Sequence, residues 1–332
     1  MLTYTEISFP GLGISLNPST GITLGSFSIR WYGLVIALGL CLAVLYACRR
    51  SSQFGFREDD VIDGVLWVTP FAILCARAYY CAFSWEQYAA NPISCLYIWE
   101  GGLAIYGGVI GAVLGCLVYC RVKKLNVFAL LDLVCLGFLI GQCIGRWGNF
   151  FNREAFGEET SSFLRMGLYN PVTGQTSYVH PTFLYESIWC LVGFILLFRY
   201  IKKRKFNGDI TLRYLIWYGA GRFWIEALRT DSLMLVPSIG LRVSQLLAGI
   251  AVVAGVAAEI YFTRKFKGKP LMVPLALSAE NKAAMKKLDG PIAFAGADTQ
   301  LPASASRKEF VEKTERYNAE VKQKLEEQQK NH

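Results

Sequence analysis

The chain has 332 residues, of which 53% are hydrophobic and only 18% are charged. Soluble domains usually carry about 25% charged residues, so the composition argues against an ordinary water-soluble enzyme. The 31 glycines and 11 prolines show neither a period nor an excess, which excludes collagen-like and disordered chains. The net charge of +9 fits the basic cytoplasmic loops of a hydrophobic chain better than a nucleic-acid-binding face.

Seven apolar segments are long enough to cross a bilayer, which requires about 20 mostly apolar residues per helix. In chain order they cover residues 30–48, 61–81, 97–119, 128–150, 182–200, 210–228 and 240–262. We therefore expect an all-α fold, a polytopic membrane protein with seven transmembrane helices in a membrane domain of residues 30–263. Residues 1–29 lack a basic start and a long hydrophobic stretch, so they predict an external, exposed polar arm and not a signal peptide.

Two further segments lie outside the predicted helices. The loop 151–181 carries turn signals at Asn170-Pro171 and Thr173-Gly174, which predict a small external head. Residues 264–332 are rich in charge and predict a cytoplasmic tail that is partly disordered. A weak helical stripe in this tail leaves a partner-binding helix as the alternative; it consists of Phe310, Tyr317, Val321 and Leu325.

Lysine and arginine gather in alternate loops, which indicates the orientation of the chain. One set of loops holds fifteen of them: Arg49, Arg50, Arg57, Arg121, Lys123, Lys124, Arg199, Lys202, Lys203, Arg204, Lys205, Arg264, Lys265, Lys267 and Lys269. The other set holds five: Arg30, Arg153, Arg165, Arg229 and Arg242. The positive-inside rule then places the N-terminus outside and the C-terminus in the cytoplasm, in agreement with an odd number of spans.

Small residues recur every fourth position in two of the predicted spans, which predicts close packing of helices in lipid. The residues are Gly107, Gly111 and Gly115 in one span and Gly137, Gly141 and Gly145 in the next.

Cysteine and histidine do not form metal-binding patterns. The ten cysteines contain no C-x-x-C pair, and the only histidines are His180 and His332. We therefore expect no zinc site and no cofactor. Most cysteines lie in apolar runs, as small hydrophobic residues do, although Cys81 and Cys95 flank a short loop and could pair if it is external.

Polar side chains from five predicted helices meet at one level, the outer half of the bilayer. Ionisable residues in membrane spans are costly and usually face an interior or a water-filled cavity. The candidates are Tyr32, Tyr106, Arg146, Asn149, Arg153, Glu154, Gly157, His180, Glu186, Tyr218, Arg222, Glu226 and Arg229. Tyr218, Arg222, Glu226 and Arg229 share one helical stripe, and Arg146, Asn149 and Arg153 share another if the helix continues through Arg153.

Arg146 has no acidic neighbour one turn away in its own span, so we expect an external anion as its partner. A guanidinium presents a planar fork of donors that suits a phosphate, and a phospholipid head group lies at this depth. Structural alternatives remain for other members: Arg222 and Glu226 as a neutralising helix pair, Tyr32 as an interfacial belt residue, and His180 as a helix-start residue.

Five blocks of this sequence resemble the signature of the prolipoprotein diacylglyceryl transferase family. They are RWYG at 30–33, GGLAIYGG at 101–108, GRWGNFFNREAFG at 145–157, HPTFLYE at 180–186 and GRFWIEALR at 221–229. The blocks occur in the family's order and are specific because five separate motifs agree. The tail after residue 264 lies outside the resemblance and is long for the family.

The resemblance implies a seven-helix enzyme of the bacterial cytoplasmic (inner) membrane that catalyses the first step of lipoprotein maturation. Such an enzyme transfers the diacylglyceryl group of phosphatidylglycerol to the lipobox cysteine in the signal peptide of an exported prolipoprotein. The products are a thioether and glycerol 1-phosphate. By this resemblance Arg146 holds the phosphate and Arg222 is a second essential arginine. Other functional positions are matched by Tyr32, Asn149, Glu154, Gly157, Tyr218 and Glu226, and we add His180, Glu186 and Arg229 as substrate-binding candidates.

Tyr106 departs from the pattern of well-studied members, which carry a histidine there that has been proposed as a general base. A tyrosine has an ordinary pKa near 10 and accepts a proton poorly unless a cation stabilises the phenolate. Either Tyr106 orients the thiol or phosphate by hydrogen bonding, or another residue takes the proton, with His180 and Glu226 as candidates. The alternative function, a membrane transporter for an anionic solute, is opposed by the lack of an internal repeat and by the off-centre polar level.

Overall fold

The computed structural model describes residues 4–24, 27–123, 125–230, 234–236, 241–267, 272–274 and 300–302, with six single positions between 312 and 327. The helical stripe predicted at residues 310–325 lies outside the described residues. The chain forms two compact units. The first contains Met1–Tyr46 and Asp132–Leu271, and the second contains Ala47–Leu131 and Met272–His332.

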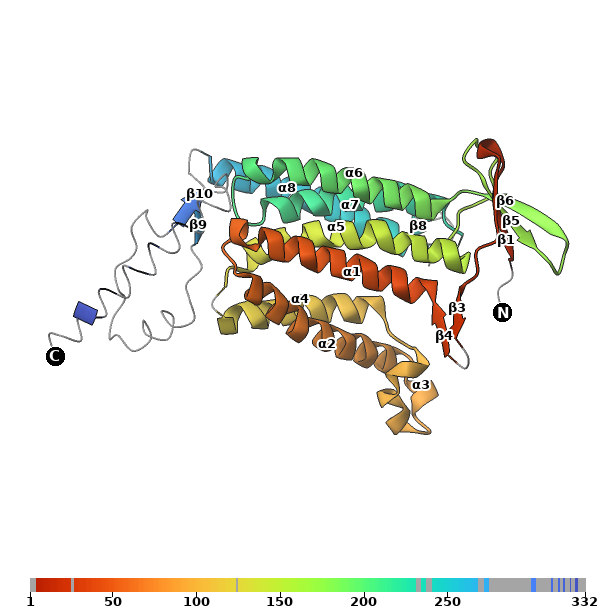
Figure 1. Cartoon of the computed structure of the whole chain (residues 1–332), viewed down its shortest axis with the longest axis horizontal. Coiled ribbons are helices and arrows are strands. Elements are labelled where there is room, and N and C mark those ends of the chain that lie inside the picture. Colours follow the sequence, from red (N-terminus) through yellow and green to blue (C-terminus); the bar gives the residue numbers. More distant parts are fainter. Residues whose placement is uncertain are drawn as a thin grey trace. The chain divides into compact units, whose positions relative to one another are not determined.

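Seven long helices dominate the described part of the chain (Figure 1). They are α1 (Trp31–Arg50), α2 (Glu58–Phe83), α4 (Ile105–Lys123), α5 (Val127–Asn152), α6 (Thr182–Tyr200), α7 (Asp209–Leu228) and α8 (Val243–Lys265). Within the described residues, all of these except α7 are both long and apolar enough to cross a membrane. The chain is thus a mostly helical, multi-pass membrane protein. Helix α7 differs because it carries four charged residues: Asp209, Arg213, Arg222 and Glu226.

Short elements connect the long helices. The helical turns are η1 (Pro10–Leu12), η2 (Ser51–Phe54), α3 (Trp85–Tyr88), η3 (Pro92–Leu96), η4 (Ile98–Glu100) and η5 (Ile201–Lys203). Three strand pairs are β3 (Gly21–Leu24) with β4 (Phe27–Arg30), β7 (Met234–Val236) with β8 (Leu241–Arg242), and β9 (Met272–Pro274) with β10 (Gln300–Pro302).

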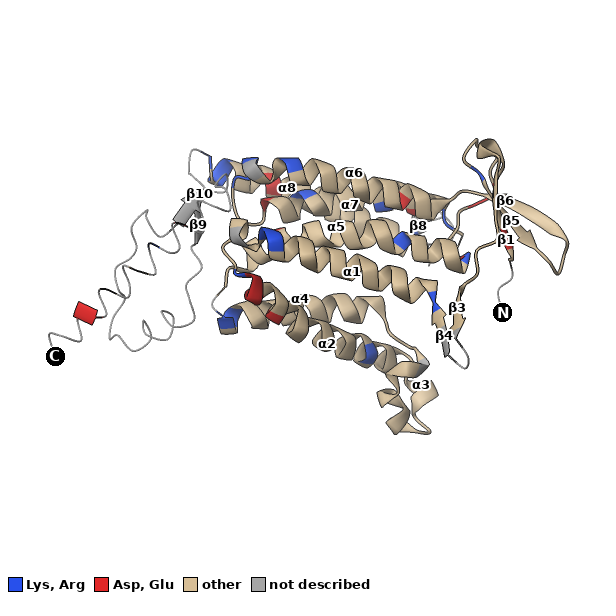
Figure 2. Ribbon diagram, in the orientation of Figure 1, with Lys and Arg blue, Asp and Glu red and all other residues tan. Residues whose placement is uncertain are grey.

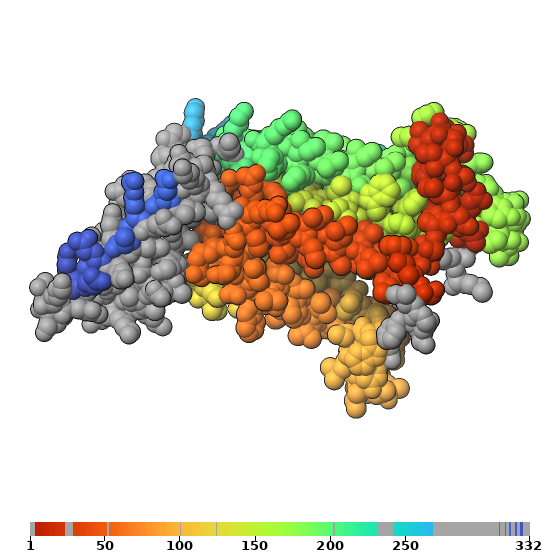
Figure 3. Space-filling model, viewed as in Figure 1, coloured from red at the N-terminus to blue at the C-terminus, as the bar shows by residue number. Residues whose placement is uncertain are grey.

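The fold is mostly helical, as the expected all-α class requires, but it also contains a four-stranded antiparallel sheet that the sequence did not predict. Its strand order is β2-β1-β5-β6, with β1 at Glu6–Phe9, β2 at Ile14–Leu16, β5 at Met166–Asn170 and β6 at Gln175–Val179. The N-terminal segment and the loop 151–181 therefore form one structure. Figure 3 shows the N-terminal residues, in red, against the yellow-green residues of this loop.

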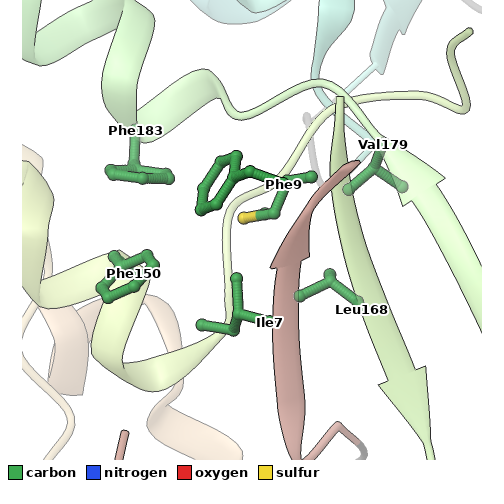
Figure 4. Packing of buried hydrophobic residues seen from close by; sticks show 7 residues of the cluster. Ile7, Phe9, Phe150, Leu168, Val179 and Phe183 are labelled. Carbon is green, nitrogen blue, oxygen red and sulfur yellow. The ribbon is translucent and has the colours of Figure 1, made fainter. Parts of the chain in front are cut away.

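The N-terminal segment, expected from the sequence as an exposed polar arm, buries two apolar residues of β1. Ile7 and Phe9 alternate with polar neighbours, as a strand with one buried face requires, and both are buried. They pack in a core with Leu168 and Val179 of the sheet and with Phe150 and Phe183 of α5 and α6 (Figure 4). The apolar alternation is only two residues long, which is why it was missed.

Glycines of both ladders pack against neighbouring helices, as predicted, although a Cβ atom on Gly141 would meet nothing within 4 Å. A Cβ atom on Gly107 of α4 would lie 2.6 Å from the carbonyl oxygen of Cys75 in α2. A Cβ atom on Gly145 of α5 would lie 3.2 Å from the Ile36 side chain in α1. Helix α4 begins at Ile105 and not at residue 97, because Gly101 and Gly102 take φ values of 91° and 72° that no helix accommodates.

A buried polar network ties the first turns of α5 and α7 together within the first unit. The carboxylate of Asp132 in α5 accepts hydrogen bonds from the backbone nitrogens of Gly208 and Thr211, both at 2.8 Å. Arg204 is buried beside this network. Burial lowers the pKa of the Arg204 guanidinium to about 10, although the carboxylates of Asp132 and Asp209 counteract this shift.

Candidate active site

A single buried carboxylate gathers three arginines in the first unit. Glu186 lies in α6, and its Oε2 forms an ion pair with Nη2 of Arg146 from α5. Its Oε1 lies 3.0 Å from Nη1 of Arg222 in α7 and 3.6 Å from Nη1 of Arg229, which directly follows α7. The arginines that the sequence predicted to meet therefore do converge.

A second carboxylate completes this group, which we call the arginine cluster: Arg146, Glu186, Arg222, Glu226 and Arg229. Glu226 Oε2 lies 2.5 Å from Arg222 Nη2 and 4.0 Å from Arg229 Nε. The neutralising pair of Arg222 and Glu226 is thus present, and Arg146, which has no acidic neighbour in its own helix, pairs with Glu186 of α6. Three guanidinium groups and two carboxylates nevertheless leave this cluster with one excess positive charge, which favours an anionic ligand.

A small pocket lies beside the arginine cluster, between α6 and α7. It is lined by Glu186, Trp189, Cys190, Tyr218, Gly221, Arg222 and Ile225. Tyr218 stacks on Tyr214 with ring centroids 5.7 Å apart, and the Tyr214 hydroxyl accepts a hydrogen bond from Gln142 of α5. The site therefore combines cations with an aromatic and aliphatic wall.

A reciprocal pair of tryptophans fixes α6 against α7 and was not recognised in the sequence. Trp189 Nε1 donates to the Trp217 carbonyl at 2.9 Å, and Trp217 Nε1 donates to the Trp189 carbonyl at 3.0 Å. Their rings stack with centroids 4.4 Å apart. Each indole lies over a glycine of the facing helix: Trp189 over Gly221 and Trp217 over Gly193. The pattern W-x-x-x-G occurs in both helices and was the available signal.

Gly157 and His180 connect the loop 151–181 to the arginine cluster. The Gly157 nitrogen donates to the His180 carbonyl at 2.9 Å, and Gly157 also forms a β-bridge with Arg229. A Cβ atom on Gly157 would lie 2.7 Å from His180 Cβ and 2.8 Å from the Leu228 carbonyl oxygen. Only glycine fits this close approach. His180 Nδ1 lies 3.2 Å from the Tyr185 hydroxyl.

Arg153 does not share the helical face of Arg146 and Asn149, because α5 ends at Asn152 and Arg153 has a φ of 55°. Its buried guanidinium instead donates to the carbonyl oxygens of Thr5 at 2.7 Å and Pro18 at 2.6 Å. Burial lowers the pKa of this group. Arg153 therefore holds the N-terminal segment in place.

The remaining candidates of the first unit lie around the outer turns of α5. Asn149 lies one turn after Arg146, and its backbone carbonyl accepts from the nitrogen of Glu154 at 3.1 Å. The exposed Glu154 carboxylate accepts from Asn152 Nδ2 at 3.2 Å. Tyr32, in the first turn of α1, packs on Gly148, where a Cβ atom would lie 2.7 Å from the tyrosine ring.

Tyr106 belongs to the second unit, where it is the second residue of α4 and is 44% exposed. Cys81 and Cys95 of the same unit are free thiols, so the pairing left open by the sequence is not formed. Among the described residues, no group of three His, Cys, Asp or Glu side chains is placed to hold a metal ion.

Comparison with known proteins gives one consistent result. The family model for prolipoprotein diacylglyceryl transferase matches residues 20–261. A phosphatidylglycerol–prolipoprotein diacylglyceryl transferase of Bacillus licheniformis is 42% identical over 264 residues, covering 77% of this chain and 95% of the relative. The enzymes of that name from Bacillus cytotoxicus and Lysinibacillus sphaericus are 45% and 42% identical, covering 70% and 78% of this chain and 88% and 96% of the relatives.

Proposed function

This chain belongs to the prolipoprotein diacylglyceryl transferase family, and on that premise we propose that it transfers the diacylglyceryl group of phosphatidylglycerol to prolipoproteins. The acceptor in this proposal is the lipobox cysteine thiol in the signal peptide of an exported prolipoprotein. The transporter alternative is not favoured, because the relatives that cover most of this chain are named as transferases.

We further propose that the chain lies in the bacterial cytoplasmic membrane with seven spans, α7 included. The last turns of α1, α4, α6 and α8 carry basic residues, whereas those of α2, α5 and α7 carry none. Figure 2 shows these basic turns in blue at the ends of α6 and α8. By the positive-inside rule, the alternation supports an external N-terminal segment and 151–181 head, and a cytoplasmic tail of residues 264–332.

The observation that carries the proposed function is the convergence of Arg146, Arg222 and Arg229 on Glu186. A phosphodiester carries one negative charge, which equals the excess positive charge of the arginine cluster. In this proposal the guanidinium groups of Arg146 and Arg222 turn from Glu186 toward the lipid. Each then donates two hydrogen bonds to two oxygens of the phosphate. The cluster therefore suits the head group of phosphatidylglycerol in charge and in geometry.

The proposed reaction is a displacement at carbon. The cysteine sulfur of the prolipoprotein attacks the glycerol methylene that bears the phosphate, so an S–C bond forms and the C–O bond breaks. The bonding electrons pass to the phosphate oxygen, which leaves as glycerol 1-phosphate, and the thiol proton passes to a base. Because a thiol has an ordinary pKa near 8.5 and only the thiolate attacks, nearby cations favour both deprotonation and departure of the phosphate.

Roles for the remaining residues follow from their contacts. Glu186 and Glu226 hold the arginines in place before the lipid binds, and Tyr218 lines the small pocket beside them. Gly157 positions Arg229 through its backbone bridge. Tyr32, Asn149 and Glu154 supply polar contacts to the substrates. The proton acceptor is Tyr106, His180 or Glu226.

The proposed function is tested with purified full-length protein, phosphatidylglycerol and a lipobox peptide. We expect the peptide to gain the mass of one diacylglyceryl group, with release of glycerol phosphate. A peptide in which serine replaces the lipobox cysteine is the matched control and gains no mass. Failure of the cysteine peptide to gain mass, with folded protein in phosphatidylglycerol membranes, contradicts the proposal; flux of an anionic solute across vesicles would then support the transporter alternative.

A further inference from the structure

A buried arginine in the second unit binds four backbone carbonyls of one loop. Arg77 lies in α2 and is 5% exposed. Its Nε donates to the Cys95 carbonyl at 2.8 Å and its Nη2 to the Ser94 carbonyl at 2.8 Å. Its Nη1 donates to the carbonyls of Gly101 at 2.6 Å and Gly102 at 3.1 Å.

The loop bound by Arg77 leads directly into the first turn of α4, which carries Tyr106. Gly101 and Gly102 both take positive φ values, which no helix accommodates, so the chain is non-helical at these two residues before α4 begins. The Ala104 nitrogen then donates to the Ala76 carbonyl, next to Arg77, at 3.1 Å. Arg77 and its neighbour therefore hold both the glycine pair and the start of the helix.

Gly102 and Arg77 fit each other so closely that a side chain on Gly102 would displace the guanidinium. A Cβ atom on Gly102 would lie 2.4 Å from Arg77 Nη1 and 2.8 Å from the ring of Tyr80. The guanidinium also lies over the ring of Tyr88, 5.2 Å from its centroid. A planar group with five N–H donors is needed to reach carbonyls from two separate parts of the loop, and lysine offers only a point charge.

We propose that Arg77 is a positioning residue for the transfer reaction: it fixes residues 94–102 in the one conformation that places Tyr106 for catalysis. The inference rests on the proposed function and on a role for Tyr106 in it. Arg77 itself is enclosed by protein carbonyls and has no need to touch substrate. Because a misplacement of about 1 Å can lower a rate about 100-fold, loss of these four hydrogen bonds is sufficient to impair transfer.

The test is a double-mutant cycle on the full-length protein with phosphatidylglycerol and a lipobox peptide. We expect Arg77→Gln to lower kcat/KM at least tenfold when Tyr106 is intact and less than threefold in a Tyr106→Ala background. Gly102→Ala displaces the guanidinium without removing it and should lower kcat/KM in the same way. Arg77→Lys should have a kcat/KM between those of Arg77→Gln and the wild-type protein. Rates are normalised to folded protein from size exclusion in detergent.

Lys123→Gln is the matched control, because Lys123 forms an exposed 2.7 Å ion pair with Asp63 in the same two helices and should leave transfer unchanged. Equal losses from Arg77→Gln in both Tyr106 backgrounds, wild-type transfer by Arg77→Gln, or wild-type transfer by Tyr106→Ala would overturn the inference. Amide hydrogen exchange tests the role of Arg77 independently of the proposed function. If the wild-type chain transfers no diacylglyceryl group, the proposed function fails, whereas faster exchange of residues 98–104 in Arg77→Gln still reports the positioning contact.

Discussion

Buried Glu186 and partly exposed Arg222, on the neighbouring helices α6 and α7, form an ion pair of 3.0 Å, and Glu186 also pairs with Arg146 and Arg229. One carboxylate thus contacts all three cations. Removal of its charge leaves these cations without their common counter-ion. Glu186 is therefore the residue that all three arginines share before the lipid binds.

Glu186→Gln should separate binding of the lipid from its reaction. The variant loses a negative charge, so the arginine cluster attracts the phosphodiester at least as strongly and the KM for phosphatidylglycerol should not rise. The arginines lose their common anchor, so kcat should fall about tenfold or more. Steady-state kinetics with varied lipid measures both constants. A raised KM with an unchanged kcat would mean that Glu186 itself binds substrate.

Arg146→Ala should abolish transfer, and Arg146→Lys should recover little of it. Lysine keeps the charge but loses the planar fork that binds two phosphate oxygens at once. Initial rates of peptide lipidation in matched membranes give the comparison. Arg165→Ala is the control, since Arg165 donates to nearby carbonyls of its own loop and lies over the Tyr178 ring, and it should retain wild-type rates. Near-normal transfer by Arg146→Ala would remove this residue from the mechanism.

Gly221→Ala should destabilise the α6–α7 pair and lower transfer. Its Cβ atom would lie 2.2 Å from Trp189 Nε1, so the Trp189 ring must move, which breaks its hydrogen bond to the Trp217 carbonyl and its stacking on the Trp217 ring. We expect a loss of about 2 kcal/mol in stability, about 1 kcal/mol from the hydrogen bond and about 1 kcal/mol from the aromatic stacking. Thermal unfolding in detergent measures the shift. Gly141→Ala is the control, because its Cβ atom meets nothing within 4 Å and alanine favours a helix.

The long helices could be predicted because each is a single apolar run, and six of them exceed the length and hydropathy that a membrane requires. Their ends were harder to predict. The start of α4 depends on the positive φ values of Gly101 and Gly102, and the end of α5 on the positive φ of Arg153, features of backbone conformation that composition does not report. The sheet was missed because β1 and β5 are separated by more than 150 residues, so neither carries a local signal for the other.

The arginine cluster could be anticipated because charged side chains inside a membrane span are unfavourable unless they face the protein interior, where they pair with one another or with a ligand. Its internal pairing could not, since Glu186 and Arg146 lie on different helices and spacing along a helix reveals only pairs such as Arg222 and Glu226. Arg77 was overlooked for a related reason. Its partners are backbone carbonyls, which every residue possesses, so the sequence around it shows no complementary charge or motif.

Substitutions of Tyr106 distinguish a proton acceptor from a hydrogen-bonding or packing group. If the hydroxyl takes the thiol proton, Tyr106→Phe should lose as much activity as Tyr106→Ala, while Tyr106→His should retain it, with activity extending to lower pH because an unperturbed imidazole titrates near 6.5. Transfer rates between about pH 5.5 and 9 give the profile. Full activity of Tyr106→Phe would show that no proton passes through this oxygen and would direct attention to His180 and Glu226.

Arg153→Gln should release the N-terminal segment from the head. The buried guanidinium holds Thr5 and Pro18 by two short hydrogen bonds, and bonds to a charged group contribute about 1.5–3 kcal/mol. A loss of about 2 kcal/mol raises the population of the opened segment about 30-fold, because every 1.4 kcal/mol is a factor of ten. Limited proteolysis of residues 5–20 under conditions where cleavage is slow relative to closing reports that population directly.

The matched control for this substitution is Arg165→Gln, in the same head, whose two carbonyl partners lie only three and four residues earlier in the chain. Loss of such local bonds should leave the cleavage of residues 5–20 unchanged. Ile7 and Phe9 stay buried in the core of the head in both variants, and this burial opposes opening of the N-terminal segment. The rate of cleavage within residues 5–20 should therefore depend on Arg153 and on this core together. Equal cleavage of Arg153→Gln and wild-type protein would mean that the apolar core alone holds the segment and that Arg153 contributes nothing to its closure.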